Sequence, residues 1–501
     1  MLSKVDNNGR VFPKPQVKWA DLMTTGKTQP PLRLNEHGTD VAETKTMQPA
    51  VKSDLYYALF PIYHLSKIWG LLPVRFVKQR GGRCLGQKHL IDILYGCLLL
   101  LFLIVAEVWG LWRDLRDGWE NSTRLKSETA VTVTCGDVLA VMIMAAVSVL
   151  GSPFRWDHLQ NVMNMLVEVD EKLGMVSPKK TCRFAIIIIV CTLTYLITIS
   201  IVDIYTWDFQ AKKNKKMHDK GAINYAPIYF MYTIVIIMEL QYTLATYNIG
   251  IRFARLNKNL ENLLKSGQIS DYLRKDIGLG GIGKVDVPGR MVRKTKISDW
   301  LVVGSDSRGA ADTISQLVTV HSSLCDSVLL LNSAFGLPIL AVTLTCILHL
   351  IITPYFLIIE ANSDRHWLFV ANQCFWCILH IGRMLIVVQP CYVACTESKA
   401  TAVLVSQLLS TNWDPESRKQ LEVFSLQLLH RPLDFSACGL FSVDRALVTS
   451  IAGAVTTYLV ILIQFQKADD TKDATDVLKN VSQFIKNGSV LQNATTLQKL
   501  I

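Results

Sequence analysis

Charged residues are scarce in this chain. They make up only 19% of its 501 residues, whereas 50% are hydrophobic. A disordered chain has the opposite balance, so disorder of the whole chain is excluded. The apolar residues are gathered into runs of roughly 20, which is long enough to cross about 30 Å of hydrocarbon. The sequence therefore predicts a multi-pass membrane protein rather than a soluble one.

Signatures of catalysis are also absent. The sequence contains no HExxH, no GxSxG nucleophile elbow and no metal-spaced His/Cys group, so we expect no enzyme, no cofactor and no metal site. The net charge of +11 comes without basic patches interleaved with stacking aromatics, which argues against nucleic acid as a partner. A lipid bilayer explains the charge, because cytoplasmic loops carry excess Lys and Arg.

Seven apolar segments have the length of a membrane span, and we expect each to be a helix because lipid leaves backbone groups no other partner. The first 87 residues hold no long apolar run and no signal-peptide core, so we expect them to be a retained N-terminal region. The predicted spans are 88–112, 129–150, 183–205, 225–250, 332–360, 367–394 and 445–465.

Two signals predict that the N-terminus is cytoplasmic and the C-terminus extracellular. Basic residues precede the first span, among them Arg75, Lys78, Arg80, Arg83 and Lys88. With seven spans, all four Asn-x-Ser/Thr sequons then lie outside. These glycosylation candidates are Asn121, Asn480, Asn487 and Asn493. The lysine-rich loop between spans three and four disagrees, and we interpret it as a polar outer loop.

This topology divides the chain into seven regions. Residues 251–265 and 313–331 are amphipathic and are expected to extend spans four and five into the cytoplasm. The regions are 1–87 (cytoplasmic N-terminal region), 88–250 (spans one to four), 251–331 (cytoplasmic helices with a mobile basic insertion at about 266–312), 332–394 (spans five and six), 395–444 (cytoplasmic), 445–465 (span seven) and 466–501 (extracellular tail).

Polar residues inside the spans are the main candidates for function, because they are costly in lipid and usually face a cavity or the bundle interior. Carboxylates, amides and aromatic faces together suit a sugar, and Gln373 and Trp376 share one helix face. Each residue could instead satisfy a neighbouring helix, but for the whole cluster we favour a pocket. The predicted outer halves contain Thr132, Asp137, Asp203, Trp207, Tyr229, Tyr232, Thr353, Tyr355, Glu360, Trp367, Asn372, Gln373 and Trp376, with Glu239, His349 and His380 nearer the midplane.

Span seven carries a stripe of small or polar residues on one helix face. Such a stripe packs against another helix or, repeated around a symmetry axis, lines a hydrated pore. Spacing alone does not choose between them. The stripe consists of Thr449, Gly453, Thr457, Val460 and Gln464.

The end of span seven, Thr457-Tyr458, five aliphatic residues and Gln464-Phe465, resembles the signature of insect gustatory receptors. Four further segments look like the fructose-receptor branch of that family. They are residues 434–440 (DFSACGL), 349–350, 355–357 and 376–390.

The resemblance implies a homotetrameric, ligand-gated, non-selective channel for Na⁺, K⁺ and Ca²⁺ in the plasma membrane of a chemosensory neuron. Span seven would line the pore through Thr457 and Val460, with Gln464 and Phe465 as the gate. The cytoplasmic ends of spans four to seven, including residues 395–444, would form the anchor between subunits.

The resemblance also implies that a sugar, D-fructose in this branch, binds in the outer half of spans two to six. This region overlaps the polar cluster, with Gln373 and Trp376 as its central members. The predicted ligand-binding residues are Gln373, Trp376, Asn372, Thr353, Tyr355, Asp203, Trp207, Tyr229, Tyr232, Glu360 and His380.

Three other classes of protein share some of these features. A G-protein-coupled receptor has its N-terminus outside the cell, whereas the positions of the sequons here predict a cytoplasmic N-terminus. A sugar transporter fits a midplane polar pocket equally well, although no internal repeat is found. A chemosensory channel that needs a partner subunit is a third possibility.

Overall fold

The computed structural model describes residues 55–78, 84–116, 128–174, 178–214, 225–277, 307–361 and 367–464. Its contacts separate residues 1–50, which lie outside these ranges, from residues 51–501, to which everything below refers. Seven helices among the described residues are long and apolar enough to cross a membrane, as the sequence predicted. They are Leu90–Arg116, Val131–Leu150, Pro178–Phe209, Ala226–Gln268, Gly309–Tyr355, Trp367–Leu409 and Arg445–Gln464.

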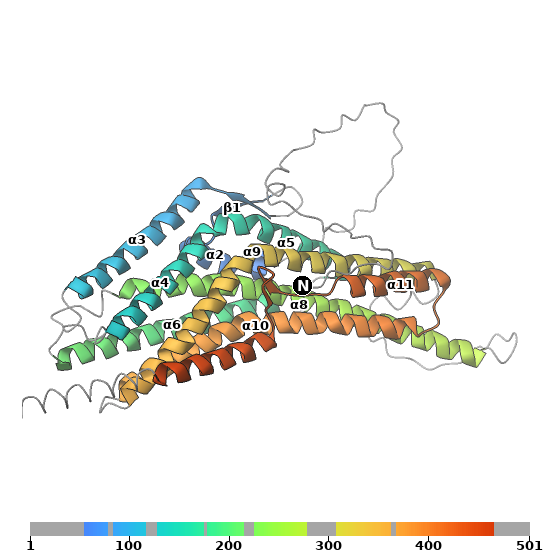
Figure 1. Cartoon of the computed structure of the whole chain (residues 1–501). Helices are drawn as coiled ribbons and strands as arrows, with labels where there is room; N and C mark the ends of the chain where they lie inside the picture. Colours follow the sequence, from blue (N-terminus) through green and yellow to red (C-terminus); the bar gives the residue numbers. More distant parts are fainter. Residues whose placement is uncertain are drawn as a thin grey trace, which may run out of the picture. The chain divides into compact units, whose positions relative to one another are not determined.

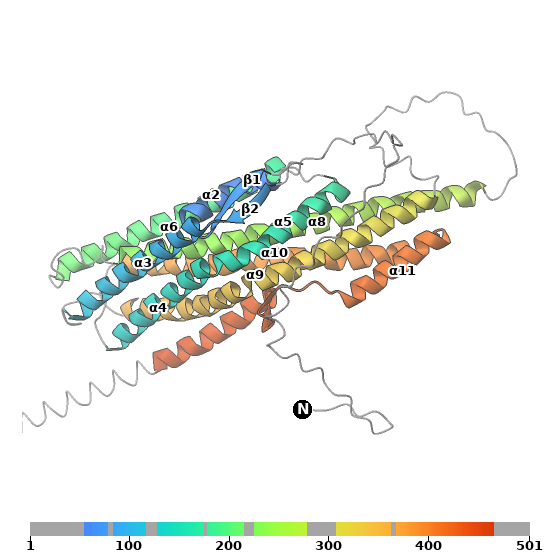
Figure 2. The same cartoon turned by 90° about the horizontal axis from the view of Figure 1, so that it is seen from above.

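Three of these helices are much longer than a membrane span. Helix α8 (Ala226–Ile277), α9 (Ser307–Ala361) and α10 (Trp367–Leu409) run as single helices through the predicted boundaries at 250, 332 and 394. Helix α9 stays helical through Pro338 and Pro354, and α10 through Pro390. Figures 1 and 2 show α11 (Pro415–His430) beside the far ends of α9 and α10, with which it is in contact.

The shorter spans pack around one half of this core. Helix α3 (Leu90–Arg116), α4 (Glu128–Leu150) and α6 (Pro178–Asn214) all contact α8. Helix α8 is the central element, because 89% of its most apolar window is buried, against 22–33% for α3, α4 and α6. Apolar outer faces on those three helices are what a lipid-facing position requires.

Helix α5 (Ser152–Leu173) was not predicted from the sequence. It is too polar to be a span, but its apolar residues recur at helical spacing and are buried against α8 and α9. Arg155 joins it to α4, donating to the carbonyls of Val147 and Ser148. Burial lowers the pKa of Arg155 to about 10, so the guanidinium remains charged at neutral pH.

The fold is mostly helical, and it also contains two short antiparallel strand pairs that the sequence did not predict. Strands β1 (Val74–Lys78) and β2 (Cys84–Lys88) form an antiparallel pair, and β3 (Ser436–Ala437) and β4 (Phe441–Ser442) form a second, shorter one. The first pair packs on α5, where the Trp156 indole donates to the Gly86 carbonyl and the Gly86 amide donates to Gln160. Such short strands carry too weak a periodicity to be separated from loop by sequence.

The N-terminal helices α1 (Leu55–Ala58) and α2 (Phe60–Ile68) pack against α6 and, in the case of α2, α8. Gln241 of α8 donates to the Ser66 hydroxyl over 2.8 Å, and both side chains are buried. The chain after α2 passes so close to α3 that a Cβ on Gly70 would lie 2.6 Å from the Cα of Gly96. Gly70 also has φ +70°, so glycine is required there twice over.

The last helix, Arg445–Gln464, is the least covered. Only 6% of its apolar window is buried. Its first turn is attached to α10, where the Arg445 guanidinium lies 3.8 Å from the Tyr392 ring centroid and donates to Gln389 over 3.0 Å. The remainder of the helix extends away from that attachment.

Candidate functional site

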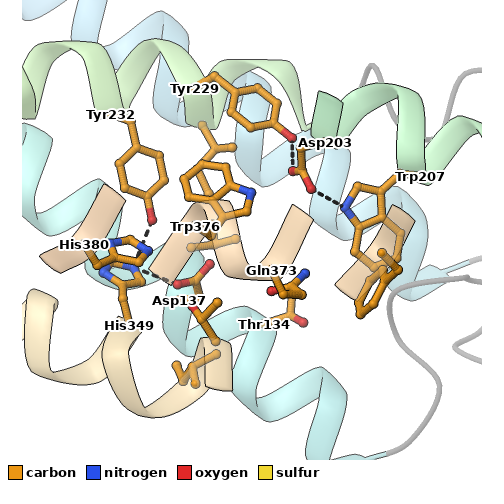
Figure 3. A pocket seen from close by; sticks show the side chains of 15 residues that line it. Thr134, Asp137, Asp203, Trp207, Tyr229, Tyr232, His349, Gln373, Trp376 and His380 are labelled. Carbon is orange, nitrogen blue, oxygen red and sulfur yellow. Dashed lines mark hydrogen bonds and ion pairs between the residues drawn. The ribbon is translucent and has the colours of Figure 1, made fainter. Parts of the chain in front are cut away.

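A cavity lies between five of the spans, toward the ends at which α8 and α10 begin. Its volume is about 110 Å³, or about 790 Å³ when the open space at its mouth is included. Figure 3 shows polar side chains from different helices pointing into it. The lining residues are Thr134, Asp137 and Val138 (α4), Asp203 and Trp207 (α6), Ile228, Tyr229 and Tyr232 (α8), His349, Ile352 and Thr353 (α9), and Phe369, Gln373, Trp376 and His380 (α10).

Asp203 is the centre of one hydrogen-bond network. Its carboxylate accepts from the Trp207 indole at 3.0 Å, from the Asn372 amide at 2.6 Å and from the Tyr229 hydroxyl. These donors come from α6, α10 and α8, and Asp203 itself is only 3% exposed. A buried carboxylate needs such donors to offset its lost hydration. Asp203 thereby ties three spans together at the wall of the cavity.

A second network connects α4, α8 and α9. The Nε2 atom of His349 lies 2.7 Å from Oδ1 of Asp137 and 3.0 Å from the Tyr232 hydroxyl. The His349 ring stacks on His380 of α10, with centroids 4.5 Å apart and planes within 7°. Both histidines are buried, whereas the Asp137 side chain is 30% exposed. Asp137 is therefore the charged end of this network that faces the cavity.

Trp376 is the central aromatic residue of the site. Its ring stacks with Tyr229 at 6.2 Å and with His380 at 5.9 Å, and is tilted toward Tyr232 at 5.3 Å. Only 9% of Trp376 is exposed, so the indole presents a small apolar surface to the cavity. Trp207 meets Phe369 edge-on at 5.7 Å on another side of the site.

Beneath the cavity, α8 and α10 are joined by an ion pair that was not predicted from the sequence. Arg383 donates from Nη2 to Glu239 Oε1 over 2.6 Å, and both side chains are 2% exposed. The guanidinium also lies 5.7 Å from the Tyr232 ring centroid. The Glu239 carboxylate is thus paired with Arg383 inside the protein, and neither residue lines the cavity.

The electrostatics of the cavity restrict its ligands. Two carboxylates line it, and none of the lining residues is a Lys or Arg. Amide, hydroxyl and imidazole groups complete its polar surface. Donor-rich neutral molecules suit such a surface, because carboxylates only accept hydrogen bonds, whereas an anion would be repelled.

Eight of the eleven predicted ligand-binding residues line this cavity. They are Thr353, Asp203, Trp207, Tyr229, Tyr232, Gln373, Trp376 and His380. Two do not, because Asn372 is 0% exposed and lies against Asp203, and Tyr355 is buried outside the lining. The side chain of the eleventh residue, Glu360, lies outside the described residues. Ligand contact by the eight remains a prediction.

The structure also adds residues to the site. Asp137 and His349 were noted in the sequence but left out of the predicted ligand set, and both line the cavity. Thr134 and Phe369 also line the cavity and were not predicted. Thr134 could have been predicted from the sequence, because it lies three residues before Asp137 and therefore on the same helix face. Trp367, noted as an outer aromatic, is 77% exposed and lies away from the lining.

The predicted pore and modification residues are described only in part. Thr457, Val460 and Gln464 are exposed on the last helix. Phe465 and the sequon residues Asn121, Asn480, Asn487 and Asn493 lie outside the described residues, as does most of the basic insertion. In the described part of the chain no three His, Cys, Asp or Glu side chains are grouped so that they could hold a metal.

Sequence relatives of this chain are chemosensory receptors. It is 30% identical over 421 residues to "Gustatory receptor for sugar taste 43a" of Drosophila melanogaster, covering 81% of this chain and 98% of that protein. It is 22% identical over 426 residues to "Putative gustatory receptor 28b" of the same species, covering 82% and 86%.

A solved structure shares the fold. The insect olfactory receptor OR5 from Machilis hrabei matches with a TM-score of 0.55 and 14% sequence identity, over 82% of this chain and 100% of that one. A second structure of that receptor, in complex with eugenol, matches equally well. A family model described as 7tm chemosensory receptor matches residues 59–469. The protein is therefore a multi-pass member of the 7tm chemosensory receptor family, which confirms the resemblance to insect gustatory receptors seen in the sequence.

Proposed function

We propose that this protein is a gustatory receptor that acts as a sugar-gated, non-selective cation channel, with D-fructose as its most effective ligand. The observation that carries the proposal is the cavity between α4, α6, α8, α9 and α10, lined by carboxylate, amide, hydroxyl, imidazole and aromatic groups without a Lys or Arg. The relative named as a receptor for sugar taste, which aligns over almost its whole length, supports the choice of ligand class.

A sugar fits the chemistry of this lining. Its hydroxyls donate to carboxylate and amide oxygens, and its C–H faces pack on aromatic rings. Asp137, Gln373 and Thr353 offer the polar contacts, while Trp376 and Trp207 offer aromatic surface. In this proposal the N-terminus is cytoplasmic and the cavity opens to the outside of the plasma membrane of a chemosensory neuron.

The proposed channel is a homotetramer with the helix Arg445–Gln464 around its axis. The support is the exposure of this helix, since 6% burial of its apolar window leaves most of it for other subunits or lipid. Its stripe of Thr457, Val460 and Gln464 would face a hydrated pore for Na⁺, K⁺ and Ca²⁺, with Gln464 and Phe465 as the gate. The anchor between subunits would be formed by residues 395–444.

The route from cavity to gate would pass through α10. This helix carries Gln373 and Trp376 at the cavity, and Gln389 and Tyr392 at the attachment of Arg445. A sugar that binds more tightly when α10 is shifted would move the start of the last helix with it. The ligand can shift the equilibrium only by its difference in affinity for the two states.

The test is whole-cell current in cells that express only this chain, with fructose, glucose and sucrose applied in turn. A rapid inward cation current selective for fructose, present without G-protein signalling, is the expected result. Surface expression with no current would contradict a self-sufficient channel. Uptake of labelled sugar would then identify a transporter, and recovery on co-expression of another receptor would identify a missing subunit.

A further inference from the structure

The two carboxylates of the cavity have different structural settings. Asp203 is 3% exposed and accepts from Trp207, Asn372 and Tyr229. An ionised carboxylate has about four lone-pair sites, so three internal donors leave Asp203 little capacity for a ligand. Its hydrogen bonds are made to side chains of α6, α8 and α10.

Asp137 is in the opposite situation. Its side chain is 30% exposed, and its close polar partner among the described residues is His349, whose Nε2 atom lies 2.7 Å from Oδ1. In Figure 3 its carboxylate is drawn below Trp376, with His349 on one side and Gln373 and Thr134 on the other. Anchoring of one oxygen by His349 fixes the orientation of the group, while the other oxygen retains its capacity to accept.

Three polar side chains of the lining are half-buried and make no hydrogen bond to Asp203. Thr134, Asp137 and Gln373 are all intermediate in exposure, whereas Tyr232, Thr353 and His380 are at most 7% exposed. A ligand that enters this space therefore meets one accepting carboxylate flanked by an amide and a hydroxyl. No Lys or Arg in the lining competes for that carboxylate.

We infer that Asp137 is the carboxylate that accepts the ligand's hydroxyl hydrogens and sets its specificity, and that Asp203 is a positioning residue that holds α6, α8 and α10 in place. The inference rests on the proposed function, whose ligand is a neutral polyol. Asp137 selects molecules that present a hydroxyl donor at its second oxygen, with Thr134 and Gln373 completing the contact.

The test compares Asp137→Asn with wild type, using D-fructose and its singly deoxygenated analogues as agonists. Asparagine keeps the size of the side chain but exchanges one acceptor for a donor. A hydrogen bond to a charged group is lost, so the fructose concentration for half-maximal current should rise by about tenfold or more. Wild type should respond poorly to the one analogue that lacks the hydroxyl bound by Asp137, and Asp137→Asn should no longer distinguish that analogue from fructose.

A matched control separates ligand contact from positioning. Asn372→Leu removes one donor to Asp203 at a residue that is 0% exposed and does not line the cavity, and it leaves Asp137 untouched. It should lower the surface amount or the maximal current while the ranking of the deoxygenated analogues stays as in wild type. His349→Gln tests whether Asp137 acts only through the histidine. If Asp137→Asn and His349→Gln weaken the response equally and both keep the wild-type ranking, ligand contact by Asp137 is refuted.

The remaining outcomes are distinguishable. If wild type responds to fructose and Asp137→Asn gives the same dose response and ranking, the inference is wrong and the proposed function stands. If surface-expressed wild type gives no current and takes up and binds no labelled sugar, the proposed function fails, and the role of Asp137 fails with it.

Discussion

Arg383 of α10 and Glu239 of α8 form an ion pair that is almost completely buried, with Nη2 2.6 Å from Oε1 and both side chains 2% exposed. The pair lies one helical turn below His380, on the helix that carries Gln373 and Trp376. It joins two helices of the cavity wall below the ligand site. The relative position of α8 and α10 at the cavity therefore depends on a pair of charges.

Removal of one member of this pair should destabilise the receptor strongly. Glu239→Gln or Arg383→Leu leaves the other charge buried without compensation, at a cost of about 3–5 kcal/mol. We expect a large fall in the amount of folded protein, measured by thermal unfolding in detergent. The double variant Glu239→Leu/Arg383→Leu should recover much of this loss; if it is as unstable as the single variants, the charge argument is wrong.

Replacement of Trp376 should remove the sugar response. Trp376→Ala takes away an aromatic surface and opens a cavity among Tyr229, Tyr232 and His380. Loss of a buried Trp costs about 3–5 kcal/mol of stability, so the experiment needs Trp376→Phe as a companion. We expect the Phe variant to reach the surface as an oligomer with a right-shifted dose response in current recordings. A normal dose response in both variants would move the pocket elsewhere.

The last helix can be tested as the pore independently of sugar binding. Gln464→Ala or Phe465→Ala should raise the basal current or change ion selectivity, because each changes the narrow end of the proposed pore. Reversal potentials in solutions of different cations provide the measurement, and binding of labelled fructose should be unchanged. Wild-type behaviour of both variants would show that this helix does not contain the gate.

The packing of β1 and β2 on α5 depends on the absence of a side chain at Gly86. A Cβ there would lie 2.2 Å from the Trp156 ring, so Gly86→Ala must displace the indole or the strand. We expect a lower thermal unfolding temperature for this variant. Gly136→Ala is the control, because its Cβ meets nothing within 4 Å and alanine favours a helix over glycine by up to about 1 kcal/mol. Equal stability of the two variants would contradict this account.

Much of the fold could be read from the chain because lipid enforces a local rule. Every backbone group in a span must be satisfied within its own helix, so hydropathy and length alone locate the segments. Helix α5 was not predicted because it is amphipathic and does not cross the lipid, and strands β1 and β2 were not predicted because they are too short. Continuity of α8 with its polar half was expected from the amphipathic pattern after residue 250, although its end at Ile277 was not.

The site could be predicted as a set of residue types, but not as a set of contacts. Polar residues inside a span can be recognised in the sequence, because their burial in lipid costs free energy and they are therefore rare there. Eight of the eleven predicted ligand-binding residues line the cavity. The sequence did not distinguish Asn372, whose amide is used by Asp203, from Gln373 next to it. Neighbouring positions on a helix point about 100° apart, so helix rotation decides which of the two faces a cavity.

The sequence by itself determined that this chain has seven helices long and apolar enough to cross a membrane, and its motifs placed it among insect gustatory receptors, because length, hydropathy and short motifs are local properties. Only the tertiary structure decided which polar groups already satisfy one another. The donors to Asp203 come from 4, 26 and 169 residues away. The sequence around one residue does not show which distant residue will be its hydrogen-bond partner. The different roles of Asp137 and Asp203 could therefore be recognised only from the packing of five helices.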